Sequence, residues 1–90
     1  MLTINTSPPA EKYFKKLPPK HRRQVAERVF KLAENPEAPD TIPLHGYDYY
    51  RADIGEHRII YRWSSTILFV DLIGKRNDGE VYRKLKRLLK

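Results

Sequence analysis

The spacing of apolar residues at the start of the chain predicts a short strand and a helix. Residues 2–6 alternate apolar and polar side chains, as in a short edge strand. Ser7 followed by two prolines is typical of a helix start, because the serine hydroxyl can accept a hydrogen bond from a free amide of the first turn. The helix that follows has an apolar face made of Ala10, Tyr13, Phe14 and Leu17.

A second helix and an irregular connection come next. Pro18-Pro19 ends the first helix and begins another that runs to about Glu34. Its apolar stripe is formed by Val25, Val29 and Leu32. The two helices are therefore expected to form a hairpin. Residues 35–46 contain three prolines and few apolar residues, which indicates an irregular connection without packing of its own.

Alternation over residues 49–54 and 57–63 predicts a β-hairpin. Gly55-Glu56 between the two runs has turn chemistry. If the loop has two residues, Asp53 faces Arg58 across the strands, near enough to pair.

A buried strand and a basic helix complete the pattern. Residues 67–73 are apolar at nearly every position, as in a strand buried on both faces. Gly74 ends this strand, Asn77-Asp78 can cap the next helix, and Glu80 suits its positive N-terminal end. The apolar stripe of the last helix is Val81, Leu85 and Leu88, and its other face is Arg83, Lys84, Lys86, Arg87 and Lys90.

These elements predict an α+β fold in one domain over residues 1–90. An N-terminal strand and a helix hairpin are expected to pack on an antiparallel sheet of about four strands, with a C-terminal helix. Ninety residues, 40% of them hydrophobic, suffice for a single core.

Composition narrows the classes of function. The absence of cysteine excludes a disulfide scaffold, a thiolate zinc site and a cysteine nucleophile. No metal-ligand motif is visible, so neither a metal nor another cofactor is expected. The chain has no signal-like start and no apolar run near the ~20 residues that span a bilayer. We therefore expect a cytoplasmic protein without a membrane partner.

The net charge of +7 is concentrated at the two ends of the chain. Residues 1–34 hold eight Lys and Arg against three Glu, and residues 75–90 hold seven against two acids, so each end carries +5. Residues 35–74 hold three Arg against six acids, which is −3. Such an imbalance favours a polyanionic partner, either nucleic acid or an acidic protein segment.

Four side chains of the strands and the last helix suit a phosphate site, namely Arg51, Arg58, Arg76 and Tyr82. Arginine binds phosphate with a planar fork and stays charged. Two of them also have a structural interpretation: Arg58 can pair with Asp53 or Asp71, and Tyr82 can be a core residue of its helix. Arg76, at a strand end, is harder to explain structurally.

Histidines and tyrosines offer further candidates. His21, His45 and His57 are scattered over a helix start, a loop and a strand, so an acid–base pair of histidines is a minor alternative. Tyr47, Tyr49 and Tyr50 could stack unpaired bases, although Tyr50 suits the core better.

Three segments give the chain a resemblance to a known family. They are Leu44-His45-Gly46, the run from Tyr50-Arg51 through Gly55-Glu56-His57-Arg58-Ile59-Ile60-Tyr61-Arg62, and Gly74-Lys75-Arg76-Asn77-Asp78-Gly79-Glu80-Val81-Tyr82. With these segments and its order of elements, the chain resembles the RelE/ParE superfamily of bacterial and archaeal toxins, the RelE branch in particular. The resemblance implies a toxin of a type II toxin–antitoxin system. It further implies a metal-independent endoribonuclease that cuts mRNA, typically in the ribosomal A site, and an acidic, RelB-like antitoxin.

The resemblance also implies roles for single residues. Arg58 would contact the scissile phosphate, Arg76 would stabilise charge in the transition state, and Tyr82 would act on the 2′-hydroxyl. Arg51 would be the first of two basic residues on its strand, and Asp53 stands where the best-known relatives carry lysine. The expected substrate-binding residues are Arg51, Lys75, Arg83 and Tyr49.

Two other functions are compatible with the same fold. One is a ParE-type toxin that binds DNA gyrase and cleaves nothing. The other is a basic RNA- or protein-binding module without activity.

Overall fold

The computed structural model describes residues 1–77 and 79–88, without the side chains of Glu80 and Leu88. The elements in chain order are β1 (Thr3–Thr6), α1 (Pro8–Lys15), α2 (Pro19–Glu34), β2 (Ile42–Pro43), β3 (Tyr50–Ile54), β4 (His57–Trp63), β5 (Ile67–Lys75) and α3 (Glu80–Leu88). The predicted cap at Asp78 and the predicted surface position of Lys90 lie outside this part of the chain.

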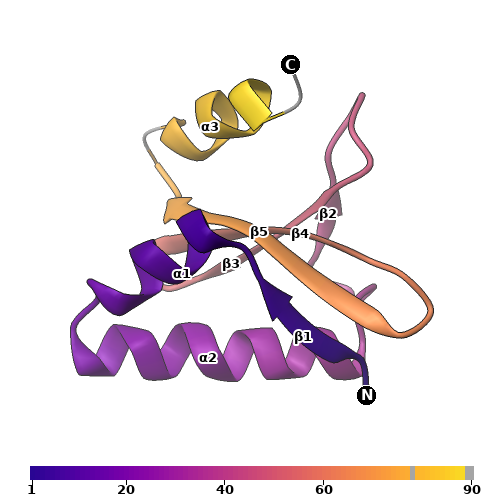
Figure 1. Cartoon of the computed structure of the whole chain (residues 1–90), viewed down its shortest axis with the longest axis horizontal. Coiled ribbons are helices and arrows are strands. Elements are labelled where there is room, and N and C mark those ends of the chain that lie inside the picture. Colours follow the sequence, from indigo (N-terminus) through magenta and orange to yellow (C-terminus); the bar gives the residue numbers. More distant parts are fainter. Residues whose placement is uncertain (78, 89–90) are drawn as a thin grey trace.

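One sheet, in the strand order β1-β5-β4-β3-β2, separates the helices into two layers. The pair α1 and α2 covers one face, and α3 covers the other (Figure 1). The predicted α+β architecture is confirmed, with two differences in detail. The described sheet has five strands, and β1 pairs with β5 in parallel, because the chain crosses over through both helices before it returns to that edge.

The start of α1 is tied to the sheet by Ser7, which caps the helix as predicted. Its Oγ accepts a hydrogen bond from the Ala10 amide at 3.2 Å, and Pro8 and Pro9 occupy the first helical positions. The same hydroxyl donates to the Asp71 carbonyl of β5 at 2.6 Å. One serine therefore places α1 relative to the buried strand.

The larger core lies between the helix pair and the sheet. Its fully buried side chains include Leu32 of α2, Ile59 and Tyr61 of β4, and Leu68 of β5. Burying each such side chain contributes about 1.5–3 kcal/mol to folding. The helix hairpin predicted from the apolar stripes is thus confirmed, and the sheet supplies the surface that both helices cover.

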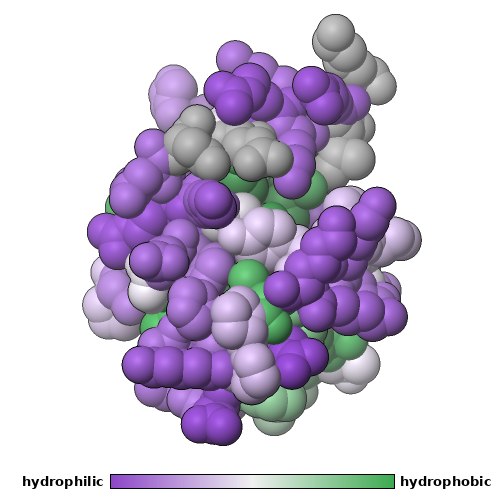
Figure 2. Space-filling view, turned by 90° about the vertical axis from the view of Figure 1, so that its left-hand side faces the viewer, coloured by the Kyte–Doolittle hydropathy of each residue, from purple (hydrophilic) through white to green (hydrophobic). Residues whose placement is uncertain are grey.

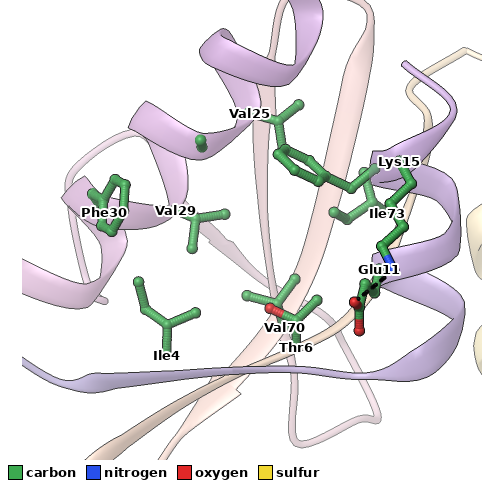
Figure 3. A pocket seen from close by; sticks show the side chains of 11 residues that line it. Ile4, Thr6, Glu11, Lys15, Val25, Val29, Phe30, Val70 and Ile73 are labelled. Atoms are coloured by element: carbon green, nitrogen blue, oxygen red, sulfur yellow. Dashed lines mark ion pairs between the residues drawn. The ribbon is translucent and has the colours of Figure 1, made fainter. Parts of the chain in front are cut away.

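An apolar groove of about 500 Å³ remains open between β1, α1 and α2. Figure 3 shows Ile4, Val29 and Val70 pointing toward one another across its floor. Phe30 lies at one end, where 52% of it is exposed. The groove runs beside β1, the edge strand of the sheet.

The connection between α2 and β3 has more structure than its prolines predicted. Ile42–Pro43 forms β2, which pairs with β3 at the sheet edge. Leu44 packs against the cluster under α3, and the Tyr61 hydroxyl donates to the Pro36 carbonyl at 2.6 Å. The expectation of a connection without packing of its own was wrong, because a two-residue edge strand is too short to leave a periodic signal.

The β3–β4 hairpin has the predicted two-residue loop. Asp53 faces Arg58, and Ile54 faces His57 across the strands. Gly55 has a φ of +56°, as the first central residue of a type II′ turn requires. A Cβ added to Gly55 would lie 3.2 Å from the Gln24 side chain of α2, so the turn packs closely on that helix.

A smaller core holds α3 on the opposite face. It consists of Ile60 and Leu72 from the sheet and Val81 and Leu85 from the helix. A Cβ added to Gly74 would lie 3.2 Å from Val81 Cβ, so this glycine lets the helix approach the strand closely. Two residues of the predicted stripe, Val81 and Leu85, are therefore confirmed as buried.

Candidate active site on the α3 face of the sheet

Three elements bring two arginines and a tyrosine together. Arg51 of β3 donates from Nη1 to the Tyr82 hydroxyl oxygen at 2.7 Å. Arg58 of β4 donates from its own Nη1 to the same oxygen at 2.8 Å. Because α3 begins above the end of β5, its third residue, Tyr82, reaches the two neighbouring strands. These residues are separated by up to 31 positions in sequence, and the fold makes them neighbours.

A carboxylate occupies the centre of this cationic group. Arg58 donates to Asp53 through Nε at 2.7 Å and Nη2 at 3.0 Å, so the pair is bidentate. Arg76 Nε lies 3.8 Å from the same carboxylate. The cross-strand pairing expected from the two-residue turn is thus confirmed. The side chain of Arg58 is only 12% exposed, whereas that of Arg76 is 48% exposed and remains accessible to a ligand.

The backbone of the β3–β4 turn holds Arg76 in place. The Arg76 amide donates to the Glu56 carbonyl at 3.0 Å. Its side chain donates from Nη1 to the Gly55 carbonyl at 3.2 Å. The arginine that follows β5 is therefore positioned by the hairpin that carries Arg58.

The charges of this site act on one another. The hydrogen bonds from Arg58 lower the pKa of the Asp53 carboxyl, and the charges of Arg58, Arg76 and Arg51 act in the same direction against the effect of burial. The same hydrogen bonds raise the pKa of the Arg58 guanidinium. Asp53 is consequently a carboxylate at neutral pH, and it neutralises part of the positive charge on which a phosphate would depend.

The other predicted substrate-binding residues lie on both sides of the sheet. Tyr49 packs against the small core under α3. The centre of its ring lies 6.0 Å from Arg62 Cζ. Arg83 is exposed on α3. Lys75 is exposed at the end of β5 and pairs in register with His57. Since His57 faces α1 and α2, Lys75 lies on the opposite side of the sheet from Tyr82.

The histidines are arranged differently from the expectation of a scattered set. His57 and His21 are hydrogen-bonded to each other at 2.8 Å, on the helix-pair face of the sheet. His45 is exposed in the loop before β3. The sequence carries no signal of the pair, because 36 residues separate its members and the contact exists only once α2 packs on the hairpin.

The surface near the site is polar. Figure 2 shows the side of the molecule where the α1–α2 turn and α3 lie, and hydrophilic side chains cover most of it. No three His, Asp or Glu side chains of the described part lie close enough together to hold a metal ion. Within the same residues, every helix is too short or too polar to cross a membrane.

A family model decides the relationship of the chain to known proteins. The model of the ParE toxin of the type II toxin–antitoxin system parDE matches residues 4–79. The chain belongs to the ParE toxin family. It is therefore a toxin of a type II toxin–antitoxin system with a RelE-like fold. No curated protein sequence matches this ParE-family toxin.

Solved structures place the ParE-family chain beside RelE toxins. The toxin–antitoxin complex RelBE2 from Mycobacterium tuberculosis matches with a TM-score of 0.73 and 25% identity, over 83% of this chain and 98% of that one. The RelE–RelB complex from Pyrococcus horikoshii matches with a TM-score of 0.71 and 27% identity, over 86% and 97%. A mutant E. coli toxin RelE in the free state matches with a TM-score of 0.80 and 23% identity, over 97% of each chain.

These matches confirm the resemblance and the fold predicted from the sequence. Two of the matched toxins were crystallised as toxin–antitoxin complexes.

Proposed function

We propose that this toxin is a metal-independent endoribonuclease that cleaves mRNA, with Arg58, Arg76 and Tyr82 as its catalytic residues. One observation carries the proposal: the guanidinium of Arg58 binds both the Asp53 carboxylate and the Tyr82 hydroxyl. An anion and a proton-transfer group are thereby held side by side. RNA cleavage needs this combination, because its nucleophile, the 2′-hydroxyl, is adjacent to the scissile phosphate.

In this mechanism the phosphate takes the position of the Asp53 carboxylate. Arg58 can offer the same two N–H groups to phosphate oxygens, since its fork matches either anion. Arg76, which is half exposed, adds the second positive charge. The 2′-oxygen then forms a bond to phosphorus, and the bond between phosphorus and the 5′-oxygen breaks. The two arginines stabilise the negative charge on the non-bridging phosphate oxygens.

Tyr82 is the group proposed to take the proton of the 2′-hydroxyl. Its oxygen already accepts hydrogen bonds from Arg51 and Arg58. Two guanidinium groups aimed at this oxygen would disperse the negative charge that it carries once its own proton has left. In that form Tyr82 takes the proton of the 2′-hydroxyl, and the departing 5′-oxygen takes a proton from water. Tyr49, Lys75 and Arg83 are proposed to bind more distant parts of the RNA.

Primer extension on mRNA from cells that express the chain tests this proposal. Cuts within translated codons are expected with the unaltered chain and absent with Arg76→Ala. Cuts that appear with purified ribosomes and mRNA, but not with mRNA alone, would place the activity in the ribosomal A site. Intact mRNA in growth-arrested cells would contradict the nuclease.

The family model favours a second candidate, since it describes the ParE toxin. A toxin of that type would bind DNA gyrase and leave RNA intact. Its surface of action need not include Tyr82, so Tyr82→Phe would keep its toxicity. A DNA supercoiling assay with purified gyrase separates the two candidates.

The partner is proposed to be an acidic, RelB-like antitoxin. Residues 1–34 carry a net charge of +5, and within them α1 and α2 form the walls of the apolar groove of Figure 3. Charge attraction followed by burial of apolar side chains in that groove suits an acidic amphipathic segment. Basic side chains on α3 offer a second contact, and a segment bound there could also cover or displace Tyr82.

Copurification of a tagged Arg76→Ala chain from its native host tests the partner. An acidic protein of a neighbouring gene is expected, with an association rate that falls as salt rises. Phe30→Glu should weaken the complex, because it places a negative charge at the mouth of the groove. Equal capture of the partner by Phe30→Glu and by the parent would place the contact elsewhere.

A further inference from the structure

Three polar side chains form a hydrogen-bonded chain between the helix pair and the sheet. The Tyr13 hydroxyl of α1 lies 3.0 Å from His57 Nδ1. His57 Nε2 lies 2.8 Å from His21 Nδ1 of α2. His57 is only 4% exposed, and both of its ring nitrogens are engaged. An imidazole buried among apolar residues is costly unless both nitrogens are satisfied, and here one side chain from α1 and one from α2 satisfy them.

This histidine chain adjoins the turn that holds the candidate active site. His57 directly follows Gly55 and Glu56, whose carbonyls accept hydrogen bonds from Arg76. It also directly precedes Arg58 in β4. The turn itself rests on Gln24 of α2, one helical turn beyond His21. The contact between α2 and β4 is therefore connected through the β3–β4 turn to Arg58 and Arg76, although it lies on the other face of the sheet.

We propose that Tyr13, His21 and His57 are positioning residues that latch the helix pair to the β3–β4 turn and thereby set Arg58 and Arg76, and that protonation of both histidines opens the latch. The effect on RNA cleavage rests on the proposed function. The latch itself is a property of the fold and can be measured without RNA.

The number of protons decides whether the latch can form. With both imidazoles neutral, Tyr13 can donate to His57 and His57 can donate to His21. With one proton added, the bond between the rings is kept, because a protonated His57 can donate from both ring nitrogens, or a protonated His21 can donate to His57. With two protons added, both nitrogens that face each other carry hydrogen, so the bond between the rings is lost and two positive charges are adjacent.

The surroundings of the latch disfavour the charged form of His57. Burial lowers the pKa of His57, and the neighbouring His21 and Lys75 lower it further, while Glu56 acts in the opposite direction. Tyr13 is the titratable group that α1 contributes. In the unfolded chain a histidine has a pKa of about 6.5. The folded state therefore binds fewer protons than the unfolded one below that pH, and stability falls as acidification proceeds toward the folded pKa of His57.

Nuclear magnetic resonance titration between about pH 5 and 8 tests the latch. The ring signals of His57 are expected to titrate at a lower pH than those of a histidine in an unfolded chain. The backbone amide of Arg76, which reports its bond to Glu56, should follow the same curve. In His57→Gln the Arg76 amide should no longer titrate. The matched control is His45→Gln, which removes the exposed histidine and should leave both curves unchanged.

A second measurement compares activity across the same pH range. The acid side of the cleavage profile should flatten in His57→Gln and in His21→Gln, because each variant removes one of the two imidazoles that face each other. If His57→Gln fails to fold, His21→Gln carries both measurements, because His21 is only half-buried. A structural role alone would lower activity equally at every pH and leave the shape of the profile unchanged.

The outcomes separate the two proposals. An Arg76 amide that follows the histidines, in a chain that never cleaves RNA, supports the latch and overturns the nuclease. An Arg76 amide that ignores the histidines overturns the latch. So does a cleavage profile of the same shape in the parent, His57→Gln and His21→Gln, and neither result affects the nuclease.

Discussion

The two faces of the sheet are organised for different purposes. The face under α1 and α2 buries a continuous apolar core in which His57 is the buried polar exception among the described residues. The face under α3 has four buried apolar side chains, and beside them lies a cluster of three arginines, a carboxylate and a tyrosine. The first face supplies stability, and the second supplies charged side chains held at fixed distances.

This division shows how a small domain can stay folded although it contains a charged site. Like charges on Arg51, Arg58 and Arg76 repel one another, and Asp53 offsets only part of that repulsion. The opposite face must make up the difference through burial, since a domain of this size has little net stability. Substitutions on the two faces should therefore fail in different ways.

The largest effect is expected from Leu32→Ala on the helix-pair face. Leu32 is fully buried, and truncation of a buried leucine costs about 2–5 kcal/mol. Leu85→Ala is the matched variant, because Leu85 of α3 is buried in the small core to a similar extent. We expect Leu32→Ala to lower the unfolding free energy of the whole chain and Leu85→Ala mainly to loosen α3. Hydrogen exchange at the β4 amides distinguishes them, and equal exchange in both variants would contradict the division.

Next come Arg76→Ala and Tyr82→Phe on the α3 face. Each should lower cleavage and toxicity by about 100-fold or more, the usual cost of removing an electrostatic stabiliser or a proton-transfer group. Their unfolding free energies should change little, because Arg76 is half exposed and Tyr82→Phe keeps the ring that packs against the small core. Arg23→Ala, which removes an exposed arginine of α2, is the control. Growth arrest as strong as that of the parent in both variants would remove these residues from the site.

A smaller effect is expected from Asp53→Asn, which keeps the shape of the carboxylate and removes its charge. Loss of the charged pair should cost about 1 kcal/mol of stability and strengthen the binding of inorganic sulfate. Because the pKa of Asp53 is lowered in the folded state, its contribution is complete above about pH 3.9 and is lost as the pH falls through the folded value. Denaturation in acid should therefore be less steep in the variant. Weaker sulfate binding by Asp53→Asn would show that the carboxylate orders the site rather than blocks it.

The smallest effect belongs to the exposed pair at the rim of the apolar groove. On successive turns of α1, Lys15 Nζ lies 3.0 Å from Glu11 Oε1. The side chain of Glu11 is 53% exposed and that of Lys15 is 72% exposed. Solvent screens such a pair, so Glu11→Gln should change the unfolding free energy by no more than about 0.5 kcal/mol. A thermal melt that moves by more than a few degrees would mean that the rim takes part in the core.

Local rules account for the elements that could be predicted from the sequence. The serine cap, the proline breaks and the apolar stripes predicted both helices of the hairpin. The two-residue loop at Gly55-Glu56 predicted the pairing of Asp53 with Arg58, because turn length determines register. These features depend on residues close together in the chain.

Contacts between distant segments were not predictable in the same way. No pattern indicates that β1 lies parallel to β5. None indicates that Tyr82 receives hydrogen bonds from Arg51 and Arg58 together, because this depends on the angle at which α3 crosses the sheet. The family resemblance grouped the site residues by role, and the tertiary packing determines their distances.

The helix α3 follows all five strands in the chain, and this order has a genetic consequence. A premature stop codon just after β5 would remove Tyr82 and both helical members of the small core, yet keep the helix pair, the apolar groove and all five strands. Such an allele is expected to encode a harmless chain that still occupies the antitoxin. Carried on a plasmid, it would act as a dominant sensitiser of cells that also make the intact toxin, with a strength that rises with its copy number.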